Sequence, residues 1–304
     1  MTEVRGQKSE VSPLSPLPLA LCFVSTLLFA LCFPAQAQQP AKIPRIGLLT
    51  LLAKPDPFEE AFLQGLRELG YVVGQNITIE YRRAAGKVER LPELAEELVR
   101  MNVDLIVVRS TPVVQAAKNA TTTIPIVILG TADPVRSGFV ASLARPGGNI
   151  TGMSSIMPEL AGKSLELLSE IVPKLSRVAF LAHSGDPAHK LFVKEAQEAA
   201  ERFGMKFQPL VIATPEQIEG AFGAMIRERA GALIVQPLFI AILGQGERIA
   251  EFAARNHLPT ISDGNGFPEA GGLMSYGPDQ LPRYRRAAIY VDKILKGRAD
   301  GFAR

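Results

Sequence analysis

The sequence predicts an α/β protein built from two open lobes, each with a parallel sheet, and three observations indicate this. From Ile43 onward, short apolar runs rich in Val, Ile and Leu alternate with longer segments whose apolar residues recur at helical spacing. Neighbouring strands lie about 20 to 35 residues apart, which leaves room for a helix between them and favours right-handed βαβ units. The same order begins again after a Pro-Gly-Gly turn at residues 146–148.

In the first half, each predicted strand is a run of apolar and β-branched residues, and each predicted helix carries apolar residues three and four positions apart. Pro57 opens the first helix and Gly70 closes it, in line with the preferences of these residues for helix ends. The predicted strands are Ile46–Leu52, Ile77–Arg82, Asp104–Val108 and Ile124–Gly130, and the predicted helices are Pro57–Gly70, Leu91–Met101 and Thr111–Ala120.

The second half repeats this order with little residue identity. Gly204 closes a helix as Gly70 does, and the LPTISDG run matches IPIVILG in the placement of its proline and its terminal glycine. The predicted strands are Asn149–Met153, Arg177–His183, Lys206–Ile212, Ala232–Gln236, Leu258–Gly264 and a short one within Gly271–Pro278. The predicted helices are Ala161–Val172, His189–Gly204, Pro215–Arg229 and Leu281–Gly297.

Two glycine pairs, Gly147-Gly148 and Gly271-Gly272, each precede a short strand. If the chain crosses between lobes at 149–153 and returns near 272–276, the two linkers lie side by side and make a hinge. We therefore predict a first α/β lobe at 43–148, rejoined by about 277–298, and a hinge crossover with the second lobe at 149–276. The alternative is one larger sheet in which both stretches are ordinary connections.

The N-terminal segment has the order of a secretory signal peptide. Two basic residues precede an apolar run at Leu17–Phe33, and Ala35-Gln36-Ala37 follows it as a small-residue cleavage site. We therefore predict that residues 1–37 are a signal peptide cleaved after Ala37 and that the protein is periplasmic. The alternative is a retained membrane anchor, for which the apolar run is slightly short.

Composition and charge narrow the classes of function. The two cysteines, Cys22 and Cys32, both lie in the predicted signal peptide, so disulfide frameworks, thiolate catalysis and cysteine metal sites are excluded for the exported chain. The net charge of +3 is a mild surplus, and Lys and Arg form no dense stripe with interleaved aromatic residues. We therefore expect no nucleic-acid partner.

Candidate ligand-binding residues follow the predicted strands, because ligands of open α/β sheets bind beyond the carboxyl ends of the strands. Thr111 is predicted to cap a helix with proline in its first turn, and the N–H groups at such a start receive carboxylates. Asp133 is predicted to take a ligand ammonium group. Taken singly, each candidate is also an ordinary cap or turn former. The candidates are Phe58, Ser110, Thr111, Asp133 and Pro134 in the first lobe and Ser184, Asp186, Gln236, Asp263 and Tyr276 in the second.

The sequence contains no strong catalytic motif. His183, Ser184 and Asp186 are the residue types of a hydrolase triad, but they crowd one turn, whereas triad residues come from separate loops. No G-x-S-x-G elbow is present, and His183 and His189 have no visible third ligand, so we predict no metal site. We expect a binding protein without catalysis or cofactor. The alternatives are a secreted α/β hydrolase or sugar-processing enzyme, and a periplasmic sensor domain.

Several blocks between about Ile43 and Gly297 occur in the order typical of one protein family. The blocks are LRELGYVVGQNITIEYR, LPELAEELV, the STP at residues 110–112, TIPIVILGTADPV, GFVASLARPGGNITG, PELAGKSLELL, EAGGLMSYGPD and YVDKILKG. On these blocks the chain resembles the periplasmic substrate-binding proteins of ABC transporters that are similar to tryptophan and tyrosine uptake binding proteins.

The resemblance implies a type I periplasmic-binding-protein fold, with two Rossmann-like lobes joined by a hinge. It also implies a protein that captures a small molecule, with amino acids among the candidates, and delivers it to an ABC permease in the inner membrane. We expect this protein to act as a monomer. Members of the family continue past the KILKG block with a further strand and helix, so residues 299–304 are a candidate truncated tail.

Overall fold

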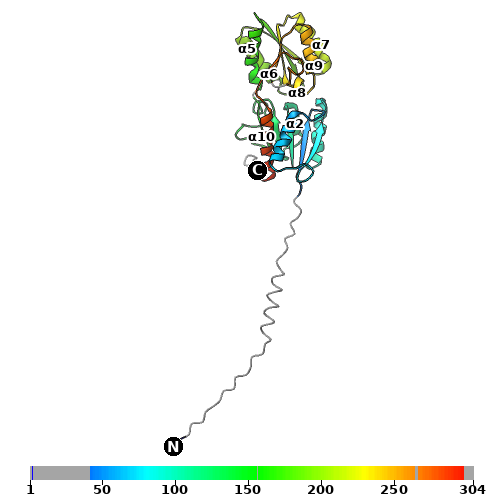
Figure 1. Cartoon of the computed structure of the whole chain (residues 1–304), viewed down its shortest axis with the longest axis vertical. Coiled ribbons are helices and arrows are strands. Elements are labelled where there is room, and N and C mark those ends of the chain that lie inside the picture. The colour runs from blue at the N-terminus through cyan, green and yellow to red at the C-terminus, as the bar shows by residue number, and fades with distance from the viewer. Residues whose placement is uncertain (1, 3–41, 156, 264–265, 298–304) are drawn as a thin grey trace. The chain divides into compact units, whose positions relative to one another are not determined.

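The computed structural model describes residue 2 and residues 42–155, 157–263 and 266–297. The predicted signal cleavage site and the candidate tail at 299–304 lie outside the described residues. Ile43–Arg304 forms one compact unit, and Figure 1 shows that its strands gather into two sheets, each flanked by helices. Within the described part of the chain, no helix is both long and apolar enough to cross a membrane.

The first lobe contains a parallel five-stranded sheet in the order β2-β1-β3-β4-β5. All but the edge strands have nearly continuous burial, as expected for a parallel sheet covered on both faces. Its strands are β1 (Arg45–Thr50), β2 (Thr78–Arg83), β3 (Leu105–Arg109), β4 (Ile126–Gly130) and β5 (Ile150–Gly152).

Helices cover both faces of this sheet. One face packs against α2 (Pro57–Glu68) and α10 (Leu281–Leu295), which lie against each other (Figure 1). The other face packs against α3 (Leu91–Arg100) and α4 (Thr111–Ala120), after the short helix η1 (Val88–Arg90). Because α10 comes from the end of the described chain, the chain returns to the first lobe after it has passed through the second.

The second lobe repeats the plan with the parallel order β10-β9-β8-β6-β7. Its strands are β6 (Arg177–His183), β7 (Lys206–Ile212), β8 (Ala232–Val235), β9 (Thr260–Asp263) and β10 (Met274–Tyr276). One face carries η2 (Met157–Leu160), α5 (Ala161–Ile171) and α6 (His189–Arg202). The other carries η3 (Pro215–Gln217), α7 (Ile218–Arg227), α8 (Pro237–Ala241) and α9 (Gly246–Arg255).

The prediction of two α/β lobes with parallel sheets is confirmed, and the alternative of one larger sheet is not, because the ten strands form two separate sheets. The predicted helices and strands are all present, with ends that differ by a few residues. Two helices, α8 and α9, were not predicted. The buried stripe of α9 consists of Gly246, Ile249, Ala250 and Ala253, and such small residues give a weak apolar signal.

The crossings between the lobes differ in detail from the predicted hinge. The stretch predicted to begin the crossover supplies β5, which pairs with β4 as the last strand of the first sheet. The returning stretch supplies β10, the edge strand of the second sheet. We therefore propose that the first lobe extends through Gly152 and that the crossings include the segments 153–155 and 277–280.

Apolar contacts also join the lobes. Leu238 and Ile242, in and directly after α8 of the second lobe, belong to the same buried cluster as the residues of α3 and α4. These apolar contacts partly close the cleft between the lobes.

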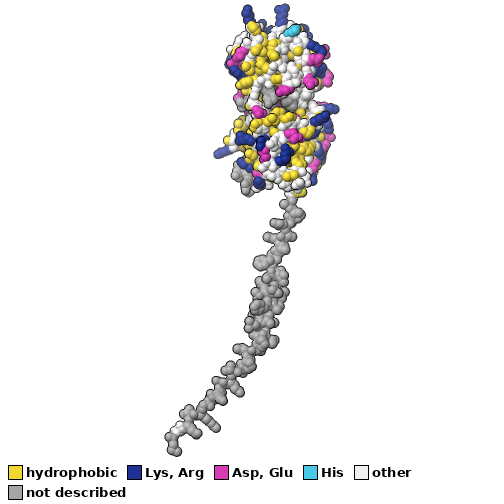
Figure 2. Space-filling model, viewed as in Figure 1, with side chains coloured by type: hydrophobic (Ala, Val, Ile, Leu, Met, Phe, Trp, Pro, Cys, Tyr) yellow, Lys and Arg dark blue, Asp and Glu magenta, His cyan; other side chains and the backbone are white. Residues whose placement is uncertain are grey.

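On the face shown in Figure 2, Lys and Arg side chains are interspersed with Asp and Glu.

Candidate functional site

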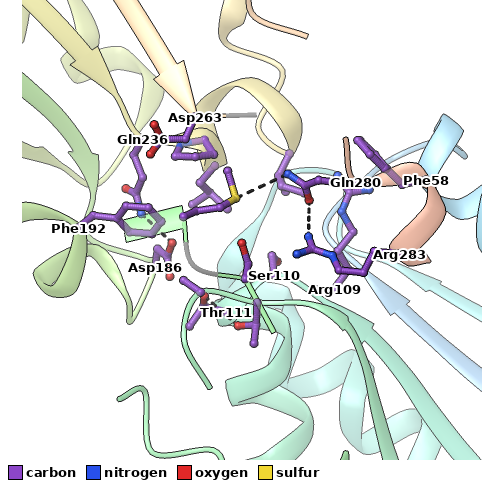
Figure 3. A pocket seen from close by; sticks show the side chains of 18 of the residues that line it. Phe58, Arg109, Ser110, Thr111, Asp186, Phe192, Gln236, Asp263, Gln280 and Arg283 are labelled. Atoms are coloured by element: carbon purple, nitrogen blue, oxygen red, sulfur yellow. Dashed lines mark hydrogen bonds between the residues drawn. The ribbon is translucent and has the colours of Figure 1, made fainter. Parts of the chain in front are cut away.

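A pocket of about 100 Å³ lies where the carboxyl ends of the two sheets face each other. This location follows from topology, because every strand in both sheets is parallel and its following loop emerges at the same edge. The lining residues are Phe58, Arg109, Ser110, Thr111, Gly130, Thr131, Ala132, Ser155, Met157, Asp186, Phe192, Gln236, Pro237, Leu238, Ile242, Asp263, Gln280, Arg283 and Tyr284. Figure 3 shows the side chains around this pocket.

The start of α4 forms one wall. Ser110 is the N-cap residue, but its side chain makes no capping hydrogen bond, and its buried hydroxyl has no partner among the described residues. Its φ of 72° lies in the left-handed region, which costs a non-glycine residue about 1 to 3 kcal/mol. A strained residue with an unpartnered hydroxyl in a pocket indicates a binding role. We predicted that Thr111 is the cap; the structure places Thr111 one residue later, as the first helical residue.

Thr111 nevertheless faces the pocket. It is buried, and its Oγ1 accepts a 3.2 Å hydrogen bond from the Thr131 hydroxyl, which comes from the loop after β4. Its side chain also lies beside the Asp186 carboxyl of the second lobe and lowers the pKa of that group. Thr111 thus contacts Thr131 of its own lobe and lies beside Asp186 of the other, and Figure 3 shows Thr111 and Asp186 in the pocket.

Arg109, at the end of β3, is neutralised within its own lobe. Its guanidinium pairs with the carboxylate of Asp56, which also caps α2 through a 2.9 Å bond from the Glu59 N–H. The guanidinium lies 4.7 Å from the ring centroid of Phe58 and 5.4 Å from that of Tyr284. Arg109 therefore holds an aromatic wall in place, and its charge is already matched.

Arg283, in the first turn of α10, has no carboxylate partner in the described part of the chain. Its Nη1 donates to the Ser154 carbonyl at 3.0 Å and its Nη2 donates to the Gln280 side-chain oxygen at 2.7 Å (Figure 3). Its Nε is buried and has no partner among the described residues. Arg283 thus brings an unmatched positive charge and a buried donor to the pocket, and its bonds join both crossing segments.

The second lobe contributes two buried carboxyl groups, of which Asp186 is the first. Its Oδ1 accepts a 2.9 Å bond from the Ala188 N–H, and its Oδ2 accepts a 2.7 Å bond from the Gln236 side chain. Gln236 is fully buried and also accepts from the His183 N–H at 2.8 Å. Burial raises the pKa of Asp186 to about 6, against lowering by the Ala188 and Thr111 hydrogen bonds.

Asp263, at the end of β9, is the second buried carboxyl. Its Oδ1 accepts a 3.0 Å bond from the hydroxyl of Ser164, a fully buried residue of α5. Burial raises the pKa of Asp263 to about 7, although the Ser164 hydrogen bond lowers it. Neither aspartate has an ion-pair partner among the described residues, so this wall of the pocket offers two carboxyl groups without a matching cation.

The raised pKa of Asp263 predicts an unusual dependence of stability on pH. The folded protein holds this proton more tightly than the unfolded chain, whose Asp pKa is about 3.9. The stabilisation is therefore full below about pH 4 and is lost as the pH rises through about 7. Relative to Asp263→Asn, the wild-type free energy of unfolding should fall by on the order of 1 kcal/mol or more between pH 5 and pH 8. Urea unfolding across this range measures the difference; a constant difference would mean that Asp263 is solvated.

The structure brings together six of the ten predicted ligand-binding residues and leaves four outside the pocket. Phe58, Ser110, Thr111, Asp186, Gln236 and Asp263 line it. Asp133, Pro134, Ser184 and Tyr276 do not. Asp133 instead accepts at Oδ1 from the N–H groups of Val135 and Arg136, so it organises a turn. Tyr276 is 39% exposed on the edge strand β10.

Several pocket residues were not predicted from the sequence. Arg283, Tyr284 and Gln280 come from the returning chain, and Phe192 and Met157 come from helices after the first crossing. One signal was available for Arg283. A helix that follows directly on a hinge segment must begin near the cleft, so polar residues of its first turn are candidates. Phe192 carries no such signal, because its spacing on α6 is that of a core residue.

The described residues contain no group of three or more His, Cys, Asp or Glu side chains arranged to hold a metal ion. The pocket therefore offers donors and acceptors for hydrogen bonds, one unmatched guanidinium and two carboxyl groups. It presents positive charge from the first lobe and negative charge from the second, with aromatic and aliphatic side chains between them.

Comparisons with known proteins agree on one family. The family model described as "ABC transporter substrate binding protein" matches residues 55–301. A protein of Clostridioides difficile (strain R20291) described as "Tyrosine-binding protein" is 28% identical over 262 residues, which cover 86% of this chain and 75% of that protein.

Two solved structures are similar to this chain over most of its length. An ABC domain in complex with L-Trp from Streptococcus pneumonia is 25% identical, with a TM-score of 0.78 over 86% of this chain and 87% of that one. A ligand-free, open substrate-binding protein from Clostridium difficile is 27% identical, with a TM-score of 0.58 over 86% and 89%. At similar identity, the chain as a whole is more similar in structure to the L-Trp complex.

Proposed function

This chain belongs to the ABC transporter substrate-binding protein family, and from that premise we propose that it captures an amino acid in the pocket between its lobes. The family assignment confirms the resemblance seen in the sequence, and the fold is that of the type I periplasmic binding proteins. Members of this family bind a substrate for a transporter, so the hydrolase and sensor alternatives are not favoured.

One observation carries the ligand proposal: the pocket has opposite charges on opposite walls. Arg283 and the Ser110 hydroxyl of the first lobe would receive a carboxylate, next to the N-terminus of α4. Asp186 and Asp263 of the second lobe would receive an ammonium group. We assign the ammonium to these two residues in place of Asp133, because Asp133 does not line the pocket.

The apolar part of the pocket favours a ligand with an apolar or aromatic side chain. Phe58 and Tyr284 form one wall, with ring centroids 4.9 Å apart, and Phe192 and Met157 face the pocket from the other lobe's helices. The relatives point the same way, since one is described as tyrosine-binding and another was solved with L-Trp.

We further propose that the protein is exported, acts as a monomer without catalysis, and hands its ligand to a permease in the inner membrane. Proteins of this family are typically extracellular or periplasmic. The sequence beyond Ala37 lacks cysteine, which suits a chain that folds outside the cytoplasm without disulfides.

Calorimetric titration tests the ligand class. We expect L-tyrosine, L-tryptophan or L-phenylalanine to bind more tightly than L-aspartate or L-lysine, because the pocket between the charged walls is apolar. Ser110→Ala should weaken the best ligand about 10-fold, the loss of one hydrogen bond to a charged group. Ser176→Ala, an exposed serine outside the pocket, is the control. Binding of sugars or dicarboxylates without binding of any amino acid would overturn the proposal.

A further inference from the structure

Asp186 lies at the boundary between the lobes and not deep within one of them. It sits in the loop between β6 and α6 and is 4% exposed. Its own lobe supplies the Ala188 N–H and the Gln236 amide, and the opposite lobe supplies the Thr111 side chain. Part of its burial therefore depends on the approach of α4, and this part is lost when the lobes move apart.

The surroundings of Asp186 provide dipoles but no matching positive charge. Two histidines flank this loop, His183 at the end of β6 and His189 at the start of α6. Burial lowers the pKa of His183, which favours the neutral ring, and the His189 Nδ1 lies 2.7 Å from the main-chain oxygen of Asp186, not from its carboxylate. Thr111 and Gln236, from α4 and the end of β8, are uncharged. An ionised Asp186 is thus buried by closure without an ion pair.

None of the other charged groups in the pocket neutralises the negative charge of an ionised Asp186. Arg109 is paired with Asp56, and Arg283 donates to Ser154 and Gln280. Asp263 is a second carboxyl group and supplies no positive charge. Burying a charge without a partner costs free energy, so closing the empty cleft is opposed by Asp186.

We propose that Asp186 is a specificity-determining residue that makes closure of the two lobes conditional on a protonated amine in the ligand. The inference rests on the proposed function, because it concerns the same pocket, and it adds which chemical group of the ligand permits closure. A ligand ammonium next to Asp186 supplies the missing charge, so the lobes close on amines. An analogue of the same shape without the amine leaves Asp186 uncompensated, and the lobes stay open.

Protonation of Asp186 removes its negative charge, so it should favour closure of the empty protein just as a ligand amine favours closure of the complex. Burial raises the pKa of Asp186 to about 6, and the part of this burial that α4 supplies exists only in the closed form, so the closed form should bind the proton more tightly than the open form. The cost of closing the empty cleft is therefore full above about pH 7 and fades as the pH falls through 6. Acidification should shift the empty protein toward the closed form.

The experiment measures closure and discrimination together. Spin labels on Asn119→Cys and Gln197→Cys, exposed positions on α4 and α6, report the separation of the lobes in a protein whose own cysteines both precede Ala37. The probes are L-tyrosine and 3-(4-hydroxyphenyl)propanoate, which lacks only the amine. For the wild type at pH 8 we expect a long distance when empty, a short one with L-tyrosine, and a long one with the deaminated acid, which should bind at least 10-fold more weakly.

Asp186→Asn should shift the empty protein toward the short distance and bring the affinities for the two probes to within about 3-fold of each other. Glu219→Gln, an exposed charge on α7, should behave as the wild type. The empty wild type at pH 5 provides the same comparison without a substitution. If the empty Asp186→Asn protein and the acidified wild type both keep the long distance, the proposal is overturned. Failure of L-tyrosine to bind, with these empty-state shifts present, would count against the proposed ligand instead.

Discussion

Gly65→Ala should lower the melting temperature of the protein by roughly 6 to 12 °C, through the loss of about 3 kcal/mol. Gly65 lies on the face of α2 that packs against α10. A Cβ at this position would come within 2.1 Å of the Arg285 carbonyl oxygen and 2.9 Å of the Ala288 Cβ. Backbone atoms cannot turn aside as a flexible side chain can, so the two helices must separate and loosen the core around Phe62 and Tyr284.

Gly220→Ala is the matched control, because Gly220 is also helical but exposed, with open space where its Cβ would stand. This substitution should stabilise the protein by about 0.5 kcal/mol, since alanine loses less backbone entropy than glycine on folding. Thermal unfolding followed by circular dichroism compares the two variants. A Gly65→Ala protein that melts like the wild type would show that α2 and α10 do not pack this closely.

Arg283→Met should weaken the binding of L-tyrosine by about 10- to 100-fold, because it removes the charged donor proposed for the ligand carboxylate. Methionine keeps much of the length of the side chain and lacks the charge. Arg286→Met, three residues further along α10 and exposed, removes the same charge outside the pocket and should leave affinity unchanged. Calorimetric titration measures both.

Tyramine distinguishes recognition of the carboxylate from a change in the hinge. It has the amine and ring of tyrosine but no carboxylate, so Arg283→Met should leave its affinity within about 2-fold of the wild-type value. Arg283 also donates to Ser154 and Gln280 in the two crossing segments. Equal losses for L-tyrosine and tyramine would therefore mean that Arg283 acts on the crossings and not on the ligand.

Much of the site was predictable because parallel sheets restrict where a ligand can bind. Ser110 follows β3 directly, Asp186 lies in the loop after β6 and Asp263 ends β9, and all three line the pocket. Asp133 lies in the loop after β4 but does not line the pocket. The sequence does not distinguish these cases, because a side chain in a loop points into the cleft or away from it according to the turn, here one with φ of 25° at Asp133.

The sequence by itself determined the order of most strands and helices, the two-lobed plan and the edge of each sheet at which the pocket lies. These follow from the periodicity of apolar residues and from the way parallel strands place their following loops. Only the tertiary structure decided that β5 pairs in the first sheet, that α10 directs Arg283 into the pocket, and that Thr111 meets Asp186 across the cleft. The physical reason is that pairing, helix rotation and lobe contact depend on residues far apart in the chain, whereas periodicity is local. The burial of Asp186 and Asp263 also depends on tertiary structure, because the elements that shield these two side chains from water come from distant parts of the chain.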